Sequence, residues 1–170
     1  MNILLITDSF PPEIRAISYM TQELAEELTI RGHKVTVATS WPQYNLARNE
    51  IKKPFKVFSK ENNVNVIRVR TLPHHKVNYL IRGIAQISLP YLFFRKIKQF
   101  VKEKIDLVIV YSPPLPLAML GAKIKKVYGA KYLLNIQDIF PQNAIDIGGI
   151  KNSLIINFFD AIFCSKIVYI

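Results

Sequence analysis

The sequence predicts an α/β fold, with an open and mostly parallel sheet covered by helices on both faces. Short apolar runs rich in β-branched residues alternate along the chain with longer segments in which apolar residues recur at helical spacing. Half of the 170 residues are hydrophobic and only 21% are charged, a balance typical of ordered globular proteins. A chain of this length is expected to form one domain, here residues 1–170, around a single core.

The first forty residues predict a strand, a helix and a second strand. Residues 2–7 form an apolar run too short for a helix, and a polar turn with two prolines ends it. Apolar residues recur at helical spacing over 17–28, and Gly32 follows as a helix stop. The β-rich run 35–39 then predicts the second strand. Since a single helix joins them, the two strands should be parallel.

The middle of the chain is less regular. Residues 40–63 show no sustained periodicity, although a short strand is expected at 56–59, and 64–69 predicts the next strand. A long helical region follows at 77–104. We expect a kink or a division into two helices near Pro90, because proline lacks a backbone N–H and clashes with the preceding turn.

The last third of the sequence continues the same alternation. Its expected elements are a strand at 106–111, a helix at 115–128 that Gly129 ends, a strand at 132–136, a helix at 154–163 and a strand beginning at 167–170. In open parallel sheets, ligands bind beyond the carboxyl ends of the strands. The residues expected at those ends are Asp8, Ser9, Ser40, Trp41, Ser112, Gln137 and Asp138.

Positive charge is concentrated in the middle of the chain. The formal net charge is +11, and residues 52–104 contain thirteen Lys or Arg against two acids, so this third carries the whole excess. Such a field attracts phosphate groups of nucleic acids, membranes or substrates. Nucleic acid is the least favoured of these partners, because neither a helix-turn-helix pattern nor aromatic residues interleaved on a sheet face are visible.

A membrane surface is the favoured anionic partner. No stretch reaches the roughly 18 apolar residues that a membrane-spanning helix needs, the best being 83–94. The helical region 77–104 nevertheless combines aromatic bulk with cations, a composition typical of helices that lie on anionic bilayers. Packing on the sheet is the alternative explanation for any single apolar residue of this helix. The predicted membrane-binding cations are Arg82, Arg95, Lys96 and Lys98.

The loop after the first strand is a candidate anion site. No GxGxxG follows that strand and no GxxxxGK[ST] occurs in the sequence, which disfavours NAD and P-loop sites, and no cofactor is expected. Pro11 and Pro12 instead lead into a helix N-terminus, whose free amides favour an anion that Arg15 would reinforce. Alternatively, the prolines only shape the turn and Arg15 is solvated.

Further candidate ligand contacts follow the other strands. Asp138 should lie at the mouth of the sheet, where its carboxylate would accept a hydroxyl proton or bind a sugar, unless it caps a helix. Asp8 has the same two interpretations. Trp41 and Tyr44 suit stacking on a sugar or an acyl chain, or holding down a loop.

A metal site is not expected. Cys164 is the only cysteine, which excludes a disulfide framework and a site of several thiolates and fits a reducing compartment. His74 and His75 are adjacent, so in an extended segment their rings point in different directions. His33 follows the first helix, where a partly cationic ring suits the negative helix end. The amino terminus lacks the basic region of a secretory signal, which favours a cytoplasmic location. Membrane binding by the helical region 77–104 would place the chain at the inner face of the plasma membrane.

Four stretches carry a resemblance to a known family: residues 3–13, 23–37, 112–114 and 137–141. In these stretches the chain resembles the N-terminal domain of family 4 glycosyltransferases, retaining enzymes with two facing Rossmann-like domains. It looks most like the subgroup that builds bacterial surface polysaccharides. The aspartate, aromatic residue and proline at 138–141 sharpen that likeness.

The resemblance implies that this domain holds the acceptor, whereas a C-terminal domain binds the nucleotide sugar. That donor-binding half is absent from the sequence, so we expect a truncated, split or partial enzyme that is inactive alone. Ser112 and Asp138 are the implied hydroxyl or sugar contacts, and no protein nucleophile is required. Gln137, at the same strand end as Asp138, is a further candidate substrate contact. Many members carry paired glycines before the first helix, and here Arg15 and Ala16 stand near that place.

Two functions follow from the sequence. The first is the acceptor-binding half of a glycosyltransferase that acts on a lipid-linked glycan in surface polysaccharide biosynthesis, with the nucleotide sugar bound only by a C-terminal domain or a partner chain. The alternative is a non-catalytic subunit that recruits a separate donor-binding chain to the membrane. A nucleotide-binding regulatory domain is disfavoured by the missing phosphate loops.

Overall fold

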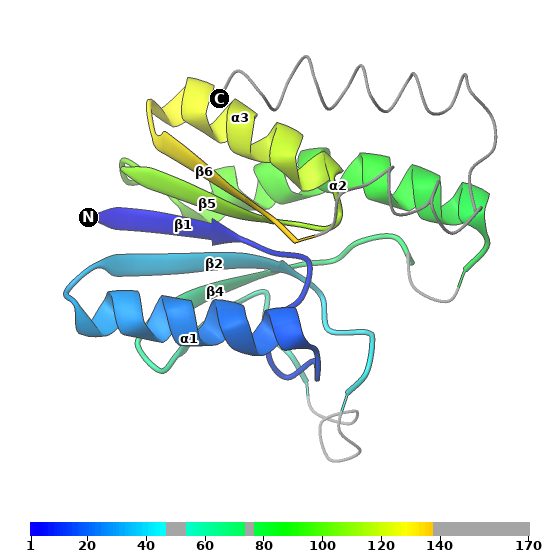
Figure 1. The fold of residues 1–170 in the computed structure, drawn as a ribbon, viewed down its shortest axis with the longest axis horizontal. Coiled ribbons are helices and arrows are strands. Elements are labelled where there is room, and N and C mark those ends of the chain that lie inside the picture. Colours follow the sequence, from blue (N-terminus) through cyan, green and yellow to red (C-terminus); the bar gives the residue numbers. More distant parts are fainter. Residues whose placement is uncertain (47–53, 74–76, 138–170) are drawn as a thin grey trace.

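The fold is a mostly parallel sheet between two layers of helices (Figure 1). A computed structural model describes residues 1–46, 54–73 and 77–137. Its elements are β1 (Asn2–Ile6), α1 (Ala16–Ile30), β2 (Lys34–Ser40), β3 (Phe58–Glu61), β4 (Val64–Val69), α2 (Tyr79–Phe100), β5 (Leu107–Ser112), α3 (Pro116–Tyr128) and β6 (Lys131–Ile136). The elements expected at 154–163 and 167–170 lie outside the described residues.

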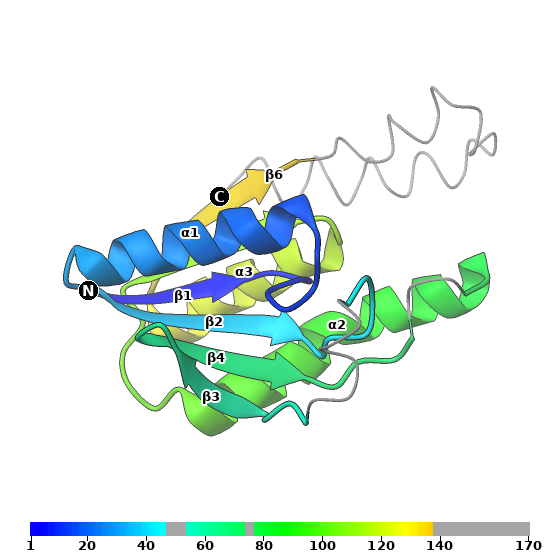
Figure 2. The same ribbon diagram turned by 90° about the horizontal axis from the view of Figure 1, so that it is seen from below.

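The six described strands form one sheet in the order β3-β4-β2-β1-β5-β6. Every neighbouring pair is parallel except β3 and β4, which form an antiparallel hairpin at one edge. Helix α1 covers one face, and α2 and α3 cover the other (Figures 1 and 2). The predicted α/β class, with its mostly parallel open sheet, is confirmed.

Strand β1 lies at the centre of the sheet and is buried on both faces. Leu4 and Ile6 belong to the hydrophobic cluster under α2 and α3, whereas Ile3 and Leu5 belong to the cluster under α1. Alternate side chains of a strand point to opposite faces, so a strand covered on both sides must be apolar throughout. This is why the β1 sequence is a continuous apolar run.

Two glycines end helices at the positions that the sequence predicts. Gly32 has φ +83° and Gly129 has φ +66°, the left-handed region that glycine adopts without a steric penalty. After α1, the His33 N–H donates to the Leu28 carbonyl over 3.0 Å, which satisfies one of the free carbonyls at that helix end. The chain then turns directly into β2.

Helix α2 differs from the prediction. It is one helix from Tyr79 to Phe100 that ends before Lys104. Of the two outcomes expected near Pro90, the division into two helices is wrong and the kink stays a prediction. The side chains of Ala85, Leu89, Phe93 and Ile97 are completely buried at helical spacing. Since they contact the same core on both sides of the proline, packing outweighs the lost backbone hydrogen bond. The short strand also lies two residues later than expected, at Phe58–Glu61.

No helix within residues 1–46, 54–73 and 77–137 is both long enough and apolar enough to cross a bilayer.

Close packing of α3 on β6 depends on Gly121. A Cβ at this position would collide with the Tyr132 ring and lie 2.7 Å from Val110 Cγ2. The Tyr132 hydroxyl donates to the Ala118 carbonyl over 2.9 Å, and its burial raises the pKa of Tyr132, so the ring is held across this helix.

We expect Gly121→Ala to lower the free energy of unfolding by about 1–3 kcal/mol, because over-packing displaces a ring that is fixed at both ends. Urea denaturation followed by circular dichroism measures the change. Gly83→Ala is the matched control, since its Cβ would meet nothing within 4 Å and α2 should gain about 0.5–1 kcal/mol from it. Equal effects of the two substitutions would contradict this packing account.

Candidate functional site

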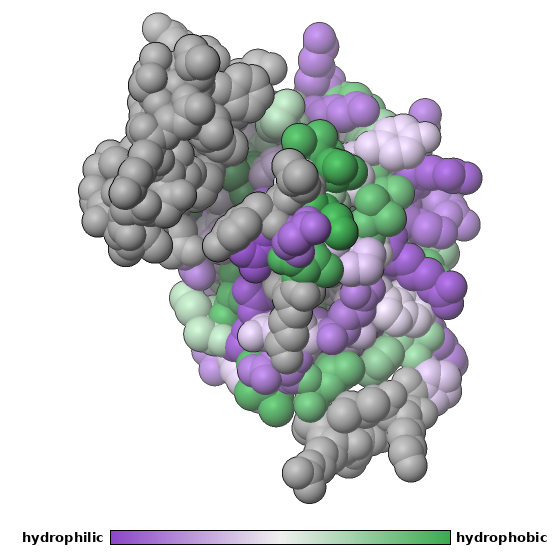
Figure 3. Space-filling view, turned by 90° about the vertical axis from the view of Figure 1, so that its right-hand side faces the viewer, coloured by the Kyte–Doolittle hydropathy of each residue, from purple (hydrophilic) through white to green (hydrophobic). Residues whose placement is uncertain are grey.

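Polar residues meet at the carboxyl edge of the sheet. Thr7, Asp8 and Ser9 follow β1, Ser40 ends β2 and Ser112 ends β5, and all five are buried. Parallel strands place their carboxyl ends on one edge, so residues far apart in the sequence meet there. Figure 3 shows this end of the molecule, where hydrophilic and apolar residues lie side by side.

Asp8 connects the two central strands to α1. Its carboxylate accepts a hydrogen bond of 2.7 Å from Ser40 Oγ and lies 3.6 Å from the Arg15 guanidinium. Asp8 is only 4% exposed, so its charge requires such partners. Arg15 is therefore engaged within the protein at the place where the sequence predicts an anion contact, and that contact stays a prediction.

Glu13 is a buried carboxylate that sequence reasoning did not assign to the site. It accepts hydrogen bonds of 2.9 Å from the backbone N–H groups of Gln43 and Tyr44 and one of 2.6 Å from Ser9 Oγ. Glu13 is 4% exposed. The only signal in the sequence is an acid directly after two prolines, and it does not reveal that the loop after β2 provides the hydrogen-bond donors.

The loops after β1 and β2 are also joined by backbone contacts. The Ile14 N–H donates to the Asn45 carbonyl over 3.0 Å, and the Asn45 side-chain amide donates to the Ile14 carbonyl over 2.8 Å. Glu13 forms an antiparallel bridge with Leu46. Together with the Glu13 carboxylate, these contacts fix the segment that carries Trp41 and Tyr44.

Trp41 belongs to a layer of aromatic rings and cations. The Arg70 guanidinium lies 4.8 Å from the centre of the Trp41 ring, and the Phe55 ring meets Trp41 edge-on at 6.3 Å. The Arg68 guanidinium lies 5.7 Å from the centre of the Phe55 ring. Cation–π contacts of this kind hold both partners in place. These contacts fix the Trp41 ring, and both interpretations of Trp41, a stacking surface for a ligand and an anchor for the loop, stay predictions.

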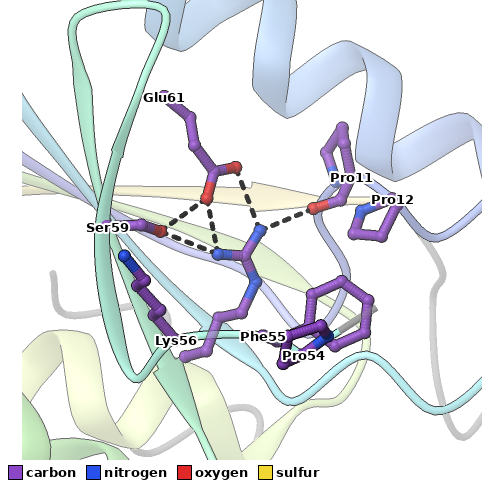
Figure 4. Close-up of a pocket in the computed structure, with 8 residues that line it drawn as sticks. Pro11, Pro12, Pro54, Phe55, Lys56, Ser59 and Glu61 are labelled. Atoms are coloured by element: carbon purple, nitrogen blue, oxygen red, sulfur yellow. Dashed lines mark hydrogen bonds and ion pairs between the residues drawn. The ribbon is translucent and has the colours of Figure 1, made fainter. Parts of the chain in front are cut away.

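A buried arginine connects the β3–β4 hairpin to the loop after β1. Arg68 is 3% exposed and donates to both Glu61 carboxylate oxygens, at 2.6 and 3.0 Å. It also donates to Ser59 Oγ at 2.9 Å and to the Pro11 carbonyl at 3.0 Å (Figure 4). Burial alone raises the pKa of Glu61. The hydrogen bonds from Arg68 and Ser59 and the positive charge of Arg68 lower it by a larger amount, so the pKa of Glu61 lies below its ordinary value.

Of the contacts predicted after β5 and β6, the structure describes Ser112 and Gln137. Ser112 is buried, and its carbonyl accepts a hydrogen bond of 3.0 Å from the Gln137 N–H. The Gln137 side-chain amide lies 4.0 Å from Met20 Sδ on α1. These two residues are therefore neighbours at the strand ends. Asp138 lies outside the described residues, so its predicted role stays a prediction.

Within residues 1–46, 54–73 and 77–137, no three His, Cys, Asp or Glu residues lie close enough together to hold a metal ion. His74, His75 and Cys164 lie outside these ranges. His33 Nδ1 lies 3.4 Å from the amino terminus of Met1.

The strand order and the polar strand ends define a Rossmann-like α/β domain with a site at its carboxyl edge. No protein-family model matches the sequence, and no curated protein matches it. Among solved structures, the chain is similar to a sucrose-phosphate synthase from Thermosynechococcus elongatus, with a TM-score of 0.58 and 11% sequence identity. The match covers 89% of this chain and 36% of that enzyme. The likeness shows that this chain shares its fold with part of that enzyme.

We expect Glu13→Gln to lower the free energy of unfolding by about 1–3 kcal/mol, because two backbone amides and Ser9 lose a charged acceptor. Urea denaturation gives the magnitude, and hydrogen exchange of the Gln43 and Tyr44 amides should accelerate by more than the exchange of the sheet. Glu23→Gln makes the same change on the exposed face of α1 and should alter neither quantity. Unchanged exchange at Gln43 and Tyr44 would show that Glu13 does not hold this loop.

Proposed function

We propose that this chain is the acceptor-binding half of a glycosyltransferase that transfers a sugar from a nucleotide sugar to a glycan in surface polysaccharide biosynthesis. The observation that carries the proposal is the cluster of polar strand ends in a fold shared with part of a glycosyltransferase. The chain spans 36% of that enzyme, so the proposal gives it one half of the task. A C-terminal domain or a partner chain binds the donor.

The chemistry of the strand ends supports a binding role. The Asp8 and Glu13 carboxylates already have internal partners, so they position loops rather than exchange protons with a substrate. What the edge offers a ligand is an aromatic ring, Trp41, beside Arg70. Sugars bind to such surfaces through hydroxyl hydrogen bonds and ring stacking. Orientation of an acceptor hydroxyl is itself a large part of the rate enhancement of a two-substrate reaction.

Helix α2 supports the further proposal that the acceptor is lipid-linked and that the chain binds an anionic membrane at the inner face of the plasma membrane. Ile84, Ile87 and Tyr91 are 65%, 74% and 66% exposed and follow one another at helical spacing. The same line of the helix continues with exposed Arg95 and Lys98. An apolar stripe followed by cations suits insertion at the headgroup boundary of anionic lipid.

The other predicted cations of α2 are arranged less uniformly. Arg82 is exposed near the start of the helix, whereas Lys96 is half-buried, with its Nζ 6.0 Å from the centre of the Phe100 ring and 3.1 Å from the Gln99 side chain. Lys96 is therefore the weakest of the four candidates for lipid contact.

The amino-terminal half of α2 projects beyond the carboxyl ends of the strands (Figures 1 and 2), so its exposed stripe lies on the same end of the molecule as the candidate site.

We expect the purified chain to bind an acceptor glycan on a glycan array but to transfer no radiolabelled sugar from any nucleotide sugar. Trp41→Ala should weaken glycan binding by roughly tenfold, since a lost aromatic contact costs about 1 kcal/mol or more. Phe58→Ala is the control: it removes an exposed ring that stacks on Phe100 of α2 and should leave glycan binding unchanged. Transfer by the chain alone, or no glycan binding at all, would contradict the acceptor-half proposal. Membrane recruitment of a donor-binding chain without glycan binding would support the non-catalytic alternative.

We expect the chain to float with vesicles that contain anionic phospholipid and to be released by salt, because exposed charges on lipid are screened. Ile84→Ser with Ile87→Ser should reduce the bound fraction several-fold at low salt, and Arg95→Gln with Lys98→Gln should remove the dependence on anionic lipid. Lys125→Gln with Lys126→Gln removes two exposed cations from α3 and serves as the control. Equal flotation with neutral vesicles would refute the proposed surface.

A further inference from the structure

A cavity of about 430 Å³ lies between the β3–β4 hairpin and the loop after β1 (Figure 4). One part of its wall is apolar and consists of proline rings and an aromatic ring: Pro11, Pro12, Pro54 and Phe55. The other part is polar and consists of Lys56, Ser59, Glu61 and Arg68. Its size falls within the range of about 300–1,000 Å³ that small-molecule sites occupy.

The polar part of this cavity favours a negatively charged ligand. Lys56 is exposed, and no described carboxylate pairs with it, whereas the charge of Glu61 is neutralised by the two hydrogen bonds from Arg68. Arg70 contacts the Trp41 ring and also lacks a carboxylate partner among the described residues. The surroundings therefore carry an excess of positive charge.

The buried Arg68 side chain has one donor without an acceptor. Its Nη1 and Nη2 groups are hydrogen-bonded, but its Nε–H has no hydrogen-bond partner in the part of the chain that the structure describes. Buried donors are almost always paired, because an unpaired one loses its hydrogen bond to water without replacement. In the structure this Nε–H is closed to solvent, so the group that meets a ligand charge at the cavity surface is the exposed Lys56.

We propose that this cavity binds an acidic monosaccharide unit, a hexose that bears a carboxylate, within the acceptor glycan. The inference rests on the proposed acceptor-binding function and names the class of sugar. Phe55 and the proline rings pack against the C–H face of the sugar, and the ligand carboxylate pairs with the exposed Lys56. Ser59 and the remaining lone pairs of Glu61 accept hydrogen bonds from sugar hydroxyls.

Titration of the full ¹⁵N-labelled chain with methyl glucuronoside, methyl glucoside and inorganic phosphate, followed by NMR, tests the proposal. Methyl glucuronoside should shift the amide resonances of residues 55–61, with an affinity at least roughly tenfold above that of methyl glucoside, as expected for one charge-assisted contact. Lys56→Gln should weaken glucuronoside binding by a similar factor. Lys60→Gln makes the same change on the opposite side of β3 and should not affect it.

Three outcomes would overturn the proposal: equal affinity for the glucoside and the glucuronoside, displacement of the glucuronoside by phosphate at equal concentration, or equal losses in the two lysine variants. Preserved amide dispersion in each variant shows that the fold is intact. The proposed function is tested separately by glycan-array binding. A chain that binds only neutral glycans keeps the acceptor role and loses this site, whereas glucuronoside binding without recognition of any larger glycan keeps the site and loses the acceptor role.

Discussion

Burial of charge at the carboxyl ends of the central strands is the constraint on which the rest of the site depends. Asp8, Glu13 and Arg68 are each less than 5% exposed. A buried charge is tolerated only when it is paired and hydrogen-bonded, so each of them requires partners from other segments. Asp8 accepts a hydrogen bond from Ser40, and Glu13 accepts one from the loop after β2. Arg68, on the β3–β4 hairpin, donates to the Pro11 carbonyl. All three connections involve the segment between β1 and α1.

This arrangement explains why the segment between β1 and α1 differs from a phosphate-binding loop. A phosphate loop keeps its backbone amides free and uses glycine so that the phosphate can approach closely. Here the Ile14 N–H donates to the Asn45 carbonyl, the Glu13 carboxylate accepts from the Gln43 N–H, and Arg15 forms an ion pair with Asp8. The loop is held by its own contacts, and it is better suited to present a shaped surface than to enclose a nucleotide diphosphate.

The fold was predictable because its signals are local, and much of the site was not. The apolar run of β1 and the helix-ending Gly32 and Gly129 act within a few residues of themselves, and the structure bears them out. The partners of Glu13 lie about thirty residues away, in a stretch without periodicity, so no local pattern reveals them. At Pro90 the local rule allowed the helix to divide, and burial of Leu89 and Phe93 on the sheet keeps it continuous.

The geometry of α2 connects the two proposed surfaces. A helix that only covered the sheet would place its exposed side in water and carry polar residues there, yet α2 exposes Ile84, Ile87 and Tyr91. Exposed apolar groups in a continuous line mark a contact surface. Because α2 begins at the end of the molecule where the strands end, a bilayer bound to that line would lie near the carboxyl edge of the sheet (Figure 1). A glycan attached to a lipid in that bilayer would then approach the strand ends that carry Trp41, which is the physical reason to join a membrane-binding helix to an acceptor site.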